Sequence, residues 1–247
     1  NVDRLKDLKE KVYKKKKGMP WYGVNVTHRI SIRIVEFMQG VEVEPDHITF
    51  FSIVLGIIAG LLFTIPEAGF YLAGALFVEL YYVFDAVDGQ YARLKKKTST
   101  TGAYFDYISN HIVQSVVFAG MGTGLFRGTG EVLYLLSGFL ASWGVLFMYI
   151  IHDAKASILR KKPLNTEDEG GELKEQDHSL PKRAFMFLHK TCTFPTTMNI
   201  ITLCSLISVM INKGLILFRF GVVYYAIIIN LVWIAKLIRI IKSKSLD

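Results

Sequence analysis

The sequence contains few of the residues that hold soft metals through sulfur. Only two of its 247 residues are cysteine. Cys192 and Cys204 lie in or beside an apolar segment, and their spacing does not match that of a metal site. We therefore predict two packed free thiols, and their presence says little about the compartment.

A cleavable signal peptide is also missing from the start of the sequence, which is polar and basic through Lys17. The first residue is not Met, as expected of a chain that begins inside a longer gene product. Residues 1–17 end in four consecutive lysines. Such a tail suits either simple solvation or attraction to anionic lipid headgroups, and the sequence leaves both interpretations open.

Apolar residues, by contrast, are abundant. They make up 51% of the chain, and the mean hydropathy is +0.34 alongside a net charge of +8. Soluble domains are rarely this apolar, and stretches of about 20 residues, long enough to cross a ~30 Å hydrocarbon core as helices, recur. We predict an all-α polytopic membrane protein with six transmembrane helices, near residues 47–65, 69–92, 103–125, 132–154, 194–212 and 215–238.

The predicted membrane domain, residues 47–247, follows a region of different character, residues 1–46. Within residues 26–39, apolar side chains repeat at helical spacing while charged ones take another side. This pattern predicts an amphipathic helix that lies on the membrane surface. Pro45 then starts a new element, and Asp46 is its expected N-cap.

The basic residues gather on one side of this topology. Of 29 lysines and arginines, 26 lie in or near the two terminal regions, the turn after the second span and the polar loop 155–183. Arg127, Lys213 and Arg219 fall toward the other side. By the positive-inside tendency, we expect both termini, the loop and the turn to face the cytoplasm.

Residues 85–110, at the junction between the second and third spans, form the most informative stretch. Asp85 and Asp88 stand three residues apart near the end of one predicted helix, and Asp106 and Asn110 stand four apart near the start of the next. Each pair therefore shares a helix face. Because a short polar turn joins antiparallel helices, we expect three carboxylates and one carboxamide to converge.

The chemistry of these residues indicates a cation and a phosphate. Crowded carboxylates are stable near neutral pH mainly when protons or cations compensate their charge. Oxygen ligands without His or Cys favour Mg²⁺, Mn²⁺ or Ca²⁺ over zinc. Gly89 and Ala92 leave a strip of helix with almost no side chain, and Arg93 adds a fork of donors suited to a diphosphate.

The spacing of these residues resembles a known signature. The pattern D-x2-D-G-x2-A-R-x8-G-x3-D-x3-D is that of the CDP-alcohol phosphotransferases, also called CDP-alcohol phosphatidyltransferases, which are integral membrane enzymes of phospholipid synthesis. The sequence matches seven of the eight fixed positions with every spacing kept, and has Asn110 in place of the final aspartate. The matching residues are Asp85, Asp88, Gly89, Ala92, Arg93, Gly102 and Asp106.

This resemblance implies an activity. A substituted phosphoryl group, usually phosphatidyl, would pass from a CDP-linked lipid or alcohol donor to an alcohol acceptor, with release of CMP. Two divalent cations, Mg²⁺ or Mn²⁺, would be held by Asp85, Asp88, Asp106 and position 110. A homodimer among membrane lipids is implied by the family alone, and we expect no nucleic-acid partner.

The resemblance also implies a nucleotide site. The expected CDP-binding residues are Asp46, Thr49, Gly89, Ala92, Arg93, Ser99 and Gly102. Asp46 and Thr49 stand at the start of the first span, which borders the nucleotide in the family. Ser99 precedes a helix N-terminus, where phosphate oxygens are favoured. The neighbouring Lys95, Lys96 and Lys97 are interpreted as a solvated edge.

Asn110 stands where the family has the aspartate that accepts the proton of the attacking alcohol, so this position is the candidate catalytic residue. A carboxamide can offer its oxygen to a metal but cannot accept that proton as a carboxylate does. Three interpretations stay open: an engineered change that holds substrate without turnover, a native variant in which His111 or His152 is the base, or a pseudoenzyme that binds nucleotide or lipid.

Two further questions stay open at this point. His152 and Asp153, at the end of the fourth span, suit either an interfacial position or acceptor binding, and the acceptor itself cannot be read. Acids that line a cation path in a transporter, or that pair with local lysines, are alternatives for the acidic cluster. Apart from Glu79, however, the acids cluster at one edge of the predicted bilayer.

Overall fold

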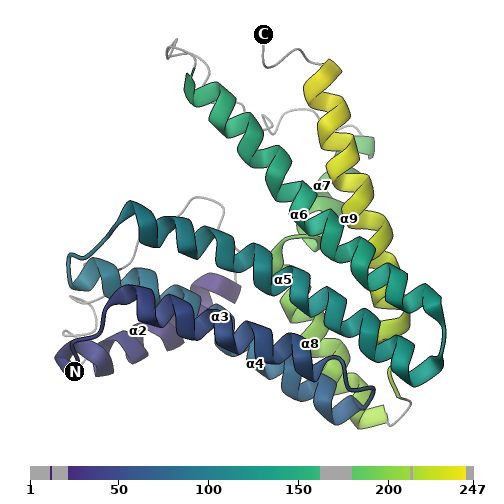
Figure 1. Cartoon of the computed structure of the whole chain (residues 1–247), viewed down its shortest axis with the longest axis horizontal. Helices are drawn as coiled ribbons and strands as arrows, with labels where there is room; N and C mark the ends of the chain where they lie inside the picture. Colours follow the sequence, from purple (N-terminus) through teal and green to yellow (C-terminus); the bar gives the residue numbers. More distant parts are fainter. Residues whose placement is uncertain (1–11, 13–21, 162–179, 212–213, 243–247) are drawn as a thin grey trace.

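The computed structural model describes residue 12 and residues 22–161, 180–211 and 214–242 (Figure 1). These residues form helices joined by short connections, and no strand occurs among them. The prediction of an all-α fold is confirmed. The elements in chain order are the π-helix η1 (Gly23–Thr27), α2 (His28–Phe37), the 3-10 helix η2 (Met38–Gly40), α3 (Pro45–Leu62), α4 (Ala68–Leu94), α5 (Thr100–Thr129), α6 (Val132–Lys161), α7 (Leu180–Thr191), α8 (Phe194–Ile211) and α9 (Ile216–Lys242).

The long helices form two groups. One group contains α3, α4 and α5, with α3 packed along both α4 and α5, and the other contains α6 and α9, with α6 packed along α5. Figure 1 shows the two groups meeting at the lower right and spreading apart toward the upper left. Because α5 contacts both α3 and α6, and α8 packs against α4, the groups form one connected bundle.

Glycine allows the helices to approach closely where the groups meet. A Cβ atom built on Gly120 of α5 would lie 2.1 Å from the carbonyl oxygen of Gly60 in α3. On another side of α5, Cβ atoms at Gly122 and at Gly138 of α6 would each lie 2.7 Å from the backbone of the other helix. Helices in apolar surroundings associate through such small residues because backbone contact maximises van der Waals packing.

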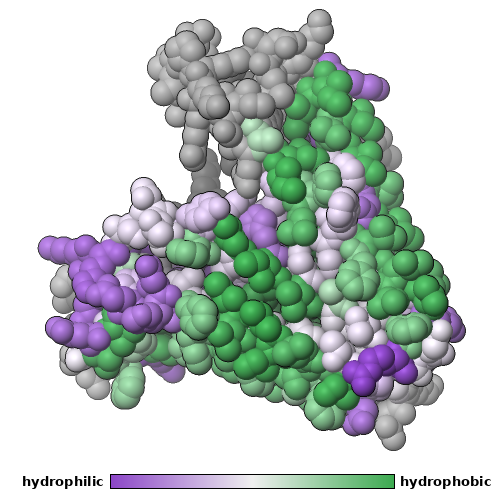
Figure 2. All heavy atoms as spheres, in the orientation of Figure 1, coloured by the Kyte–Doolittle hydropathy of each residue, from purple (hydrophilic) through white to green (hydrophobic). Residues whose placement is uncertain are grey.

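Five helices in the described ranges are long and apolar enough to cross a membrane, as expected of an integral membrane protein. They are α3, α4, residues 132–151 of α6, α8 and α9. Figure 2 shows hydrophobic residues over the middle of the bundle and hydrophilic residues gathered toward its left end. The predicted third span, residues 103–125, lies in α5, whose Asn110, His111 and Gln114 lower its hydropathy. The six-span count therefore stays a prediction.

The region before the first span is helical, as predicted, but its faces are divided differently from the expected pattern. Ser31 and Val35 are the buried residues of α2, which packs against α4. Ile30 and Phe37 remain exposed, Phe37 by 86% of its surface. An exposed apolar edge suits a helix at a membrane surface, and this placement stays a prediction.

Two local predictions were wrong. Asp46 is not the N-cap of the first span, because the cap position is taken by Glu44, whose backbone is extended, and Pro45 follows at the first helical position. The polar loop 155–183 is helical at both ends, since α6 continues to Lys161 and α7 begins at Leu180. Residues 162–179 lie outside the described part of the chain.

The structure also settles the surroundings of Glu79 and of the cysteines. Glu79 accepts hydrogen bonds from the Tyr22 hydroxyl at 2.5 Å and the Thr202 hydroxyl at 2.8 Å. It therefore links α4 to the N-terminal helices and to α8. Cys192 and Cys204 are both free, as predicted.

Candidate active site

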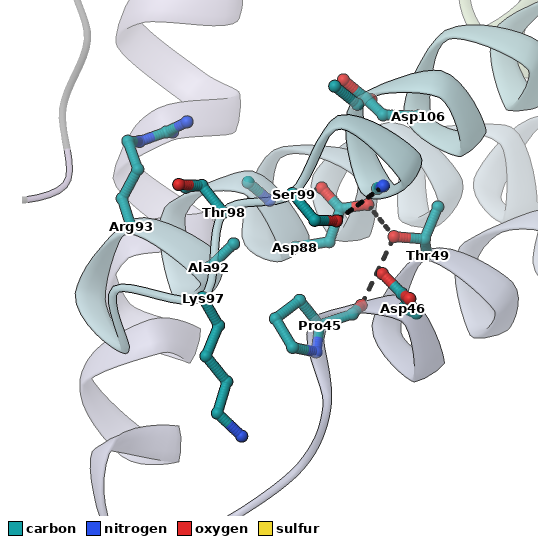
Figure 3. Close-up of a pocket in the computed structure, with 13 residues that line it drawn as sticks. Pro45, Asp46, Thr49, Asp88, Ala92, Arg93, Lys97, Thr98, Ser99 and Asp106 are labelled. Carbon is teal, nitrogen blue, oxygen red and sulfur yellow. Dashed lines mark hydrogen bonds between the residues drawn. The ribbon is translucent and has the colours of Figure 1, made fainter.

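A cavity of about 150 Å³ lies where three helix ends come together (Figure 3). The first turns of α3 and α5 and the last turns of α4 form its walls. It is lined by Pro45, Asp46, Thr49, Asp88, Gly89, Ala92, Arg93, Lys97, Thr98, Ser99, Gly102, Ala103 and Asp106. All seven residues expected to bind CDP are among them. Residues from three separate helices thus share one cavity.

Asp88 is the most firmly held of the acids. It is only 4% exposed. The Thr49 hydroxyl donates to Asp88 Oδ2 at 2.6 Å, and the Gly89 backbone N–H donates to Asp88 Oδ1. These two bonds fix the orientation of the carboxylate, and the bond from Thr49 also joins α3 to α4. Figure 3 shows the Thr49–Asp88 bond at the centre of the cavity.

Two helix N-termini face the cavity. Ser99 is the N-cap of α5, and its hydroxyl oxygen accepts a hydrogen bond from the Gly102 N–H at 2.8 Å. Asp46 lies in the first turn of α3, at the corresponding end of that helix. The positive ends of two helix dipoles therefore point toward the same space, which favours an anionic group there.

The remaining two acids of the cluster differ in their position relative to this cavity. Asp106 lines it together with Asp88, whereas Asp85 and Asn110, among the described residues, do not. The Asp85 carboxylate nevertheless lies close enough to those of Asp106 and Asp88 to be repelled by both. It accepts long hydrogen bonds of 3.4 Å from the Tyr81 hydroxyl and from the Asn110 amide. The three predicted carboxylates thus form a single cluster.

Asn110 acts as a hydrogen-bond donor in this arrangement. Its Nδ2 donates to Asp85 Oδ1 at 3.4 Å and to the backbone carbonyl of Asp106 at 3.1 Å. An aspartate at this position would place a further negative charge beside Asp85, whereas the amide supplies N–H groups to it. The carboxamide therefore relieves part of the repulsion within the cluster.

The donor atoms of the cluster are of the type that hard divalent cations prefer. Three mutually repelling carboxylates supply the oxygen ligands and the negative charge that Mg²⁺ or Mn²⁺ requires. Across the described ranges, however, no three His, Cys, Asp or Glu side chains are arranged to enclose an ion. Oxygen atoms from water or from a substrate phosphate would be needed to complete the coordination, as is usual for Mg²⁺.

Arg93 is held from two directions. Its Nε donates to the backbone carbonyl of Val12 at 2.8 Å. Its guanidinium lies over Gly89, where a Cβ atom would come within 3.3 Å of Arg93 Nη1. Figure 3 shows the side chain extending away from Asp88 and Thr49. Arg93 therefore borders the cavity while it also ties α4 to the N-terminal region.

Lys97 and Thr98 are cavity residues that the sequence did not single out. Lys97 was interpreted as part of a solvated edge, but it pairs with Glu44 at 2.6 Å across the cavity margin. The hydrogen bond and charge of Glu44 raise the pKa of the Lys97 ammonium above its ordinary value, so the lysine is cationic at neutral pH. Only the tertiary approach of the segment before α3 to the α4–α5 turn could have revealed this pair.

The acceptor predictions receive no support from side-chain positions. His152 and Asp153 belong to α6, but their side chains lie outside the described part of the structure. The ring of His111 lies 3.7 Å from the Tyr149 ring, centroid to centroid, and its Nδ1 is 2.5 Å from the Tyr107 carbonyl oxygen. His111 is thus packed among aromatic rings one position beyond Asn110.

A family model of CDP-alcohol phosphatidyltransferases matches residues 43–232, which is more than half of the chain. The chain belongs to this family. The matched region begins just before α3, ends within α9 and contains the whole cavity. Membership of the CDP-alcohol phosphatidyltransferase family therefore agrees with the resemblance carried by residues 85–110.

Two curated relatives come from different organisms. The chain is 31% identical over 123 residues to a phosphatidylinositol phosphate synthase of Streptomyces avermitilis, and the aligned region covers 49% of each protein. It is 34% identical over 97 residues to a bifunctional IPC transferase and DIPP synthase of Thermococcus kodakarensis, and the aligned region covers 38% of this chain and 21% of the relative. The matches span about half the length of the first relative and about a fifth of the second.

Proposed function

We propose that this family member transfers a substituted phosphoryl group, in the phosphatidyl form, from a CDP-linked donor to an alcohol and releases CMP. The observation that carries the proposal is the cavity shared by α3, α4 and α5. Anion-favouring helix ends, three acids, an arginine and two glycines surround a space that suits the diphosphate of the donor.

The residues of the cavity have separable roles in this proposal. Gly89 and Gly102 admit the donor close to the backbone, and Arg93 and Ser99 donate to phosphate oxygens. Asp85, Asp88, Asp106 and the oxygen of Asn110 would hold divalent cations. When bound, such cations would neutralise the diphosphate and the charge on the departing CMP.

In this proposal, the residue at position 110 limits the rate at which the alcohol attacks. The attacking alcohol must lose a proton, and a carboxylate at position 110 would accept it. The amide of Asn110 cannot do so, and its nitrogen is turned toward Asp85. We therefore expect this form of the protein to bind donor and to turn it over slowly.

The test compares the chain with its Asn110→Asp variant. CMP release would be measured in detergent micelles with CDP-diacylglycerol or CDP-choline as donor, a panel of alcohols as acceptor, and Mg²⁺ or Mn²⁺. We expect Asn110→Asp to raise CMP release about 100-fold, the usual contribution of a general base. The Asn110→Leu variant is the matched control, because it removes the amide without adding a carboxylate.

Equal rates for the chain and the Asn110→Asp variant would place the base elsewhere, with His111 the nearest candidate. A second function, nucleotide or lipid binding without turnover, is favoured by the hydrogen bond from Asn110 to Asp85. Donor binding with no CMP release by either form would support it. Failure of both forms to bind CDP would reject the transferase function and nucleotide binding alike.

The proposal also includes the orientation of the protein in the membrane. The basic residues around the cavity mouth and near the termini support a cytoplasmic position for the site and for both termini. The donor and the acceptor would then be reached from the cytoplasm, within a homodimer surrounded by lipid. Labelling of single cysteines near either terminus in intact vesicles would test this orientation.

A further inference from the structure

Lys97 lies between the Glu44 carboxylate and the cavity. Its side chain lines the cavity, yet its ammonium is paired with Glu44 at 2.6 Å. Figure 3 shows the side chain extending away from Asp88 and Asp106. The pair therefore holds a cation at the margin of a space that suits an anion.

The backbone of Lys97 is fixed while its side chain is not. The Lys97 N–H donates to the Ala92 carbonyl at 2.9 Å, which closes the C-terminal end of α4. Lys96, just before it, adopts a left-handed conformation with φ 55°. These features set the position from which the flexible stem of Lys97 starts, and the ammonium can move by rotation of that stem alone.

The ion pair with Glu44 is weak enough to exchange. The side chains of Lys97 and Glu44 are 52% and 60% exposed, and exposed pairs contribute little because water screens them. Glu44 makes no side-chain capping bond to α3 within the described part of the chain. A diphosphate offers a lysine several charged oxygens in place of one carboxylate.

A diphosphate in the cavity would be stabilised by a further cationic side chain, because acids already line this space. Asp46, Asp88 and Asp106 already line it, and Arg93 has its Nε occupied by the Val12 carbonyl. A diphosphate would add negative charge to this space. Lys97 is the remaining cationic side chain among the described residues that line the cavity.

We propose that Lys97 is a substrate-binding residue that exchanges Glu44 for a phosphate oxygen of the CDP-linked donor. Glu44 holds the ammonium at the cavity margin until the donor arrives, and then competes with the diphosphate for it. This inference rests on the proposed function, because it names a residue that recognises the same diphosphate.

The test measures binding of CDP to the full chain in detergent by isothermal titration calorimetry with Mg²⁺ present. Lys97→Gln is expected to raise the Kd about tenfold, the effect of one lost charge-assisted contact. Glu44→Gln is expected to lower the Kd about two- to threefold, because it releases the lysine from a weak ion pair. The two partners of one ion pair would thus have opposite effects.

A double variant separates competition from simple charge removal. If Glu44 acts by holding Lys97, the Glu44→Gln gain disappears in the Lys97→Gln background. If Glu44 only repels the ligand, the gain persists there and the exchange is rejected. Glu42→Gln is the matched control for the acid, since Glu42 is exposed and lies near Lys97 without being its hydrogen-bond partner. Lys96→Gln is the control for the lysine.

Other outcomes are equally decisive. Equal Kd values for Lys97→Gln and Lys96→Gln would reject the role of Lys97. A weakening by both Glu44→Gln and Lys97→Gln would assign the ion pair a structural role instead. If the unaltered chain fails to bind CDP at all, the proposed function fails, whereas CDP binding that ignores Lys97 rejects the inference alone.

Discussion

The two ends of the α3–α4–α5 group use glycine in opposite ways. At the end where the helices meet, a Cβ atom on Gly120 would lie 2.1 Å from the backbone oxygen of Gly60. At the cavity end, a Cβ atom on Gly89 would meet the Arg93 guanidinium at 3.3 Å, and one on Gly102 would meet the Ser99 hydroxyl at 3.0 Å. Backbone closes the first space, whereas movable side chains border the second.

This difference explains how an apolar bundle can contain a polar cavity. Close glycine contacts between α5 and its neighbours hold the helices together far from the site. The other ends of the helices are therefore free to stand apart, and the polar ends of α3, α4 and α5 enclose the cavity. The same residue type joins helices at one end and leaves room for a ligand at the other.

The largest expected effect is at the packed end. Gly120→Ala would force α3 and α5 apart, because its Cβ atom meets backbone that cannot rotate away. We expect a loss of about 3 kcal/mol in the free energy of unfolding, typical of overpacking. Thermal unfolding in detergent would measure it. Gly221→Ala in α9 is the matched control, since no described atom lies within 4 Å of its Cβ position; equal losses would contradict the comparison.

At the cavity end we expect a smaller effect, and we expect it on CDP affinity instead of on stability. Gly89→Ala should leave the unfolding temperature unchanged or slightly higher, because alanine favours the helix and the Arg93 side chain can yield. The added methyl group would occupy cavity space, so we expect CDP affinity to fall about tenfold, or about 1.4 kcal/mol. Calorimetric titration would show this. Loss of stability with unchanged affinity would make Gly89 a packing residue like Gly120.

The smallest effect concerns the turn between α4 and α5. Lys96 has φ 55°, a conformation that costs a non-glycine residue energy. Lys96→Gly should therefore raise the free energy of unfolding by about 0.5 kcal/mol after the entropy of glycine is counted. Lys96→Ala is the control, because it removes the charge and keeps the strain. A gain of the same size in both variants would assign it to charge.

The contents of the cavity could largely be anticipated from spacing along the chain. Asp88, Gly89, Ala92 and Arg93 share one side of α4 because helical periodicity is local, and they line the cavity together. Thr49 was expected there only by resemblance, since 39 residues separate it from the Asp88 carboxylate that it contacts. No local pattern predicts that distance.

The features that spacing along the chain did not reveal depend on tertiary contacts. Asp85 and Asn110 share helix faces with Asp88 and Asp106, but only Asp88 and Asp106 of these four residues line the cavity, and the helical spacing did not show this division. How α4 and α5 are placed by their packing against α3 decides which of these side chains reach the space. The pair of Lys97 with Glu44 likewise depends on a contact between segments.

The sequence by itself determined the helical class, the apolar lengths and the faces on which the acids, glycines and arginine stand, because these follow from the short-range geometry of one helix. Only the tertiary structure decided which side chains share the cavity, which acid is held by Thr49, and where the Lys97 ammonium rests. Those features depend on how closely separate helices approach, and backbone contact at residues such as Gly120 sets that approach.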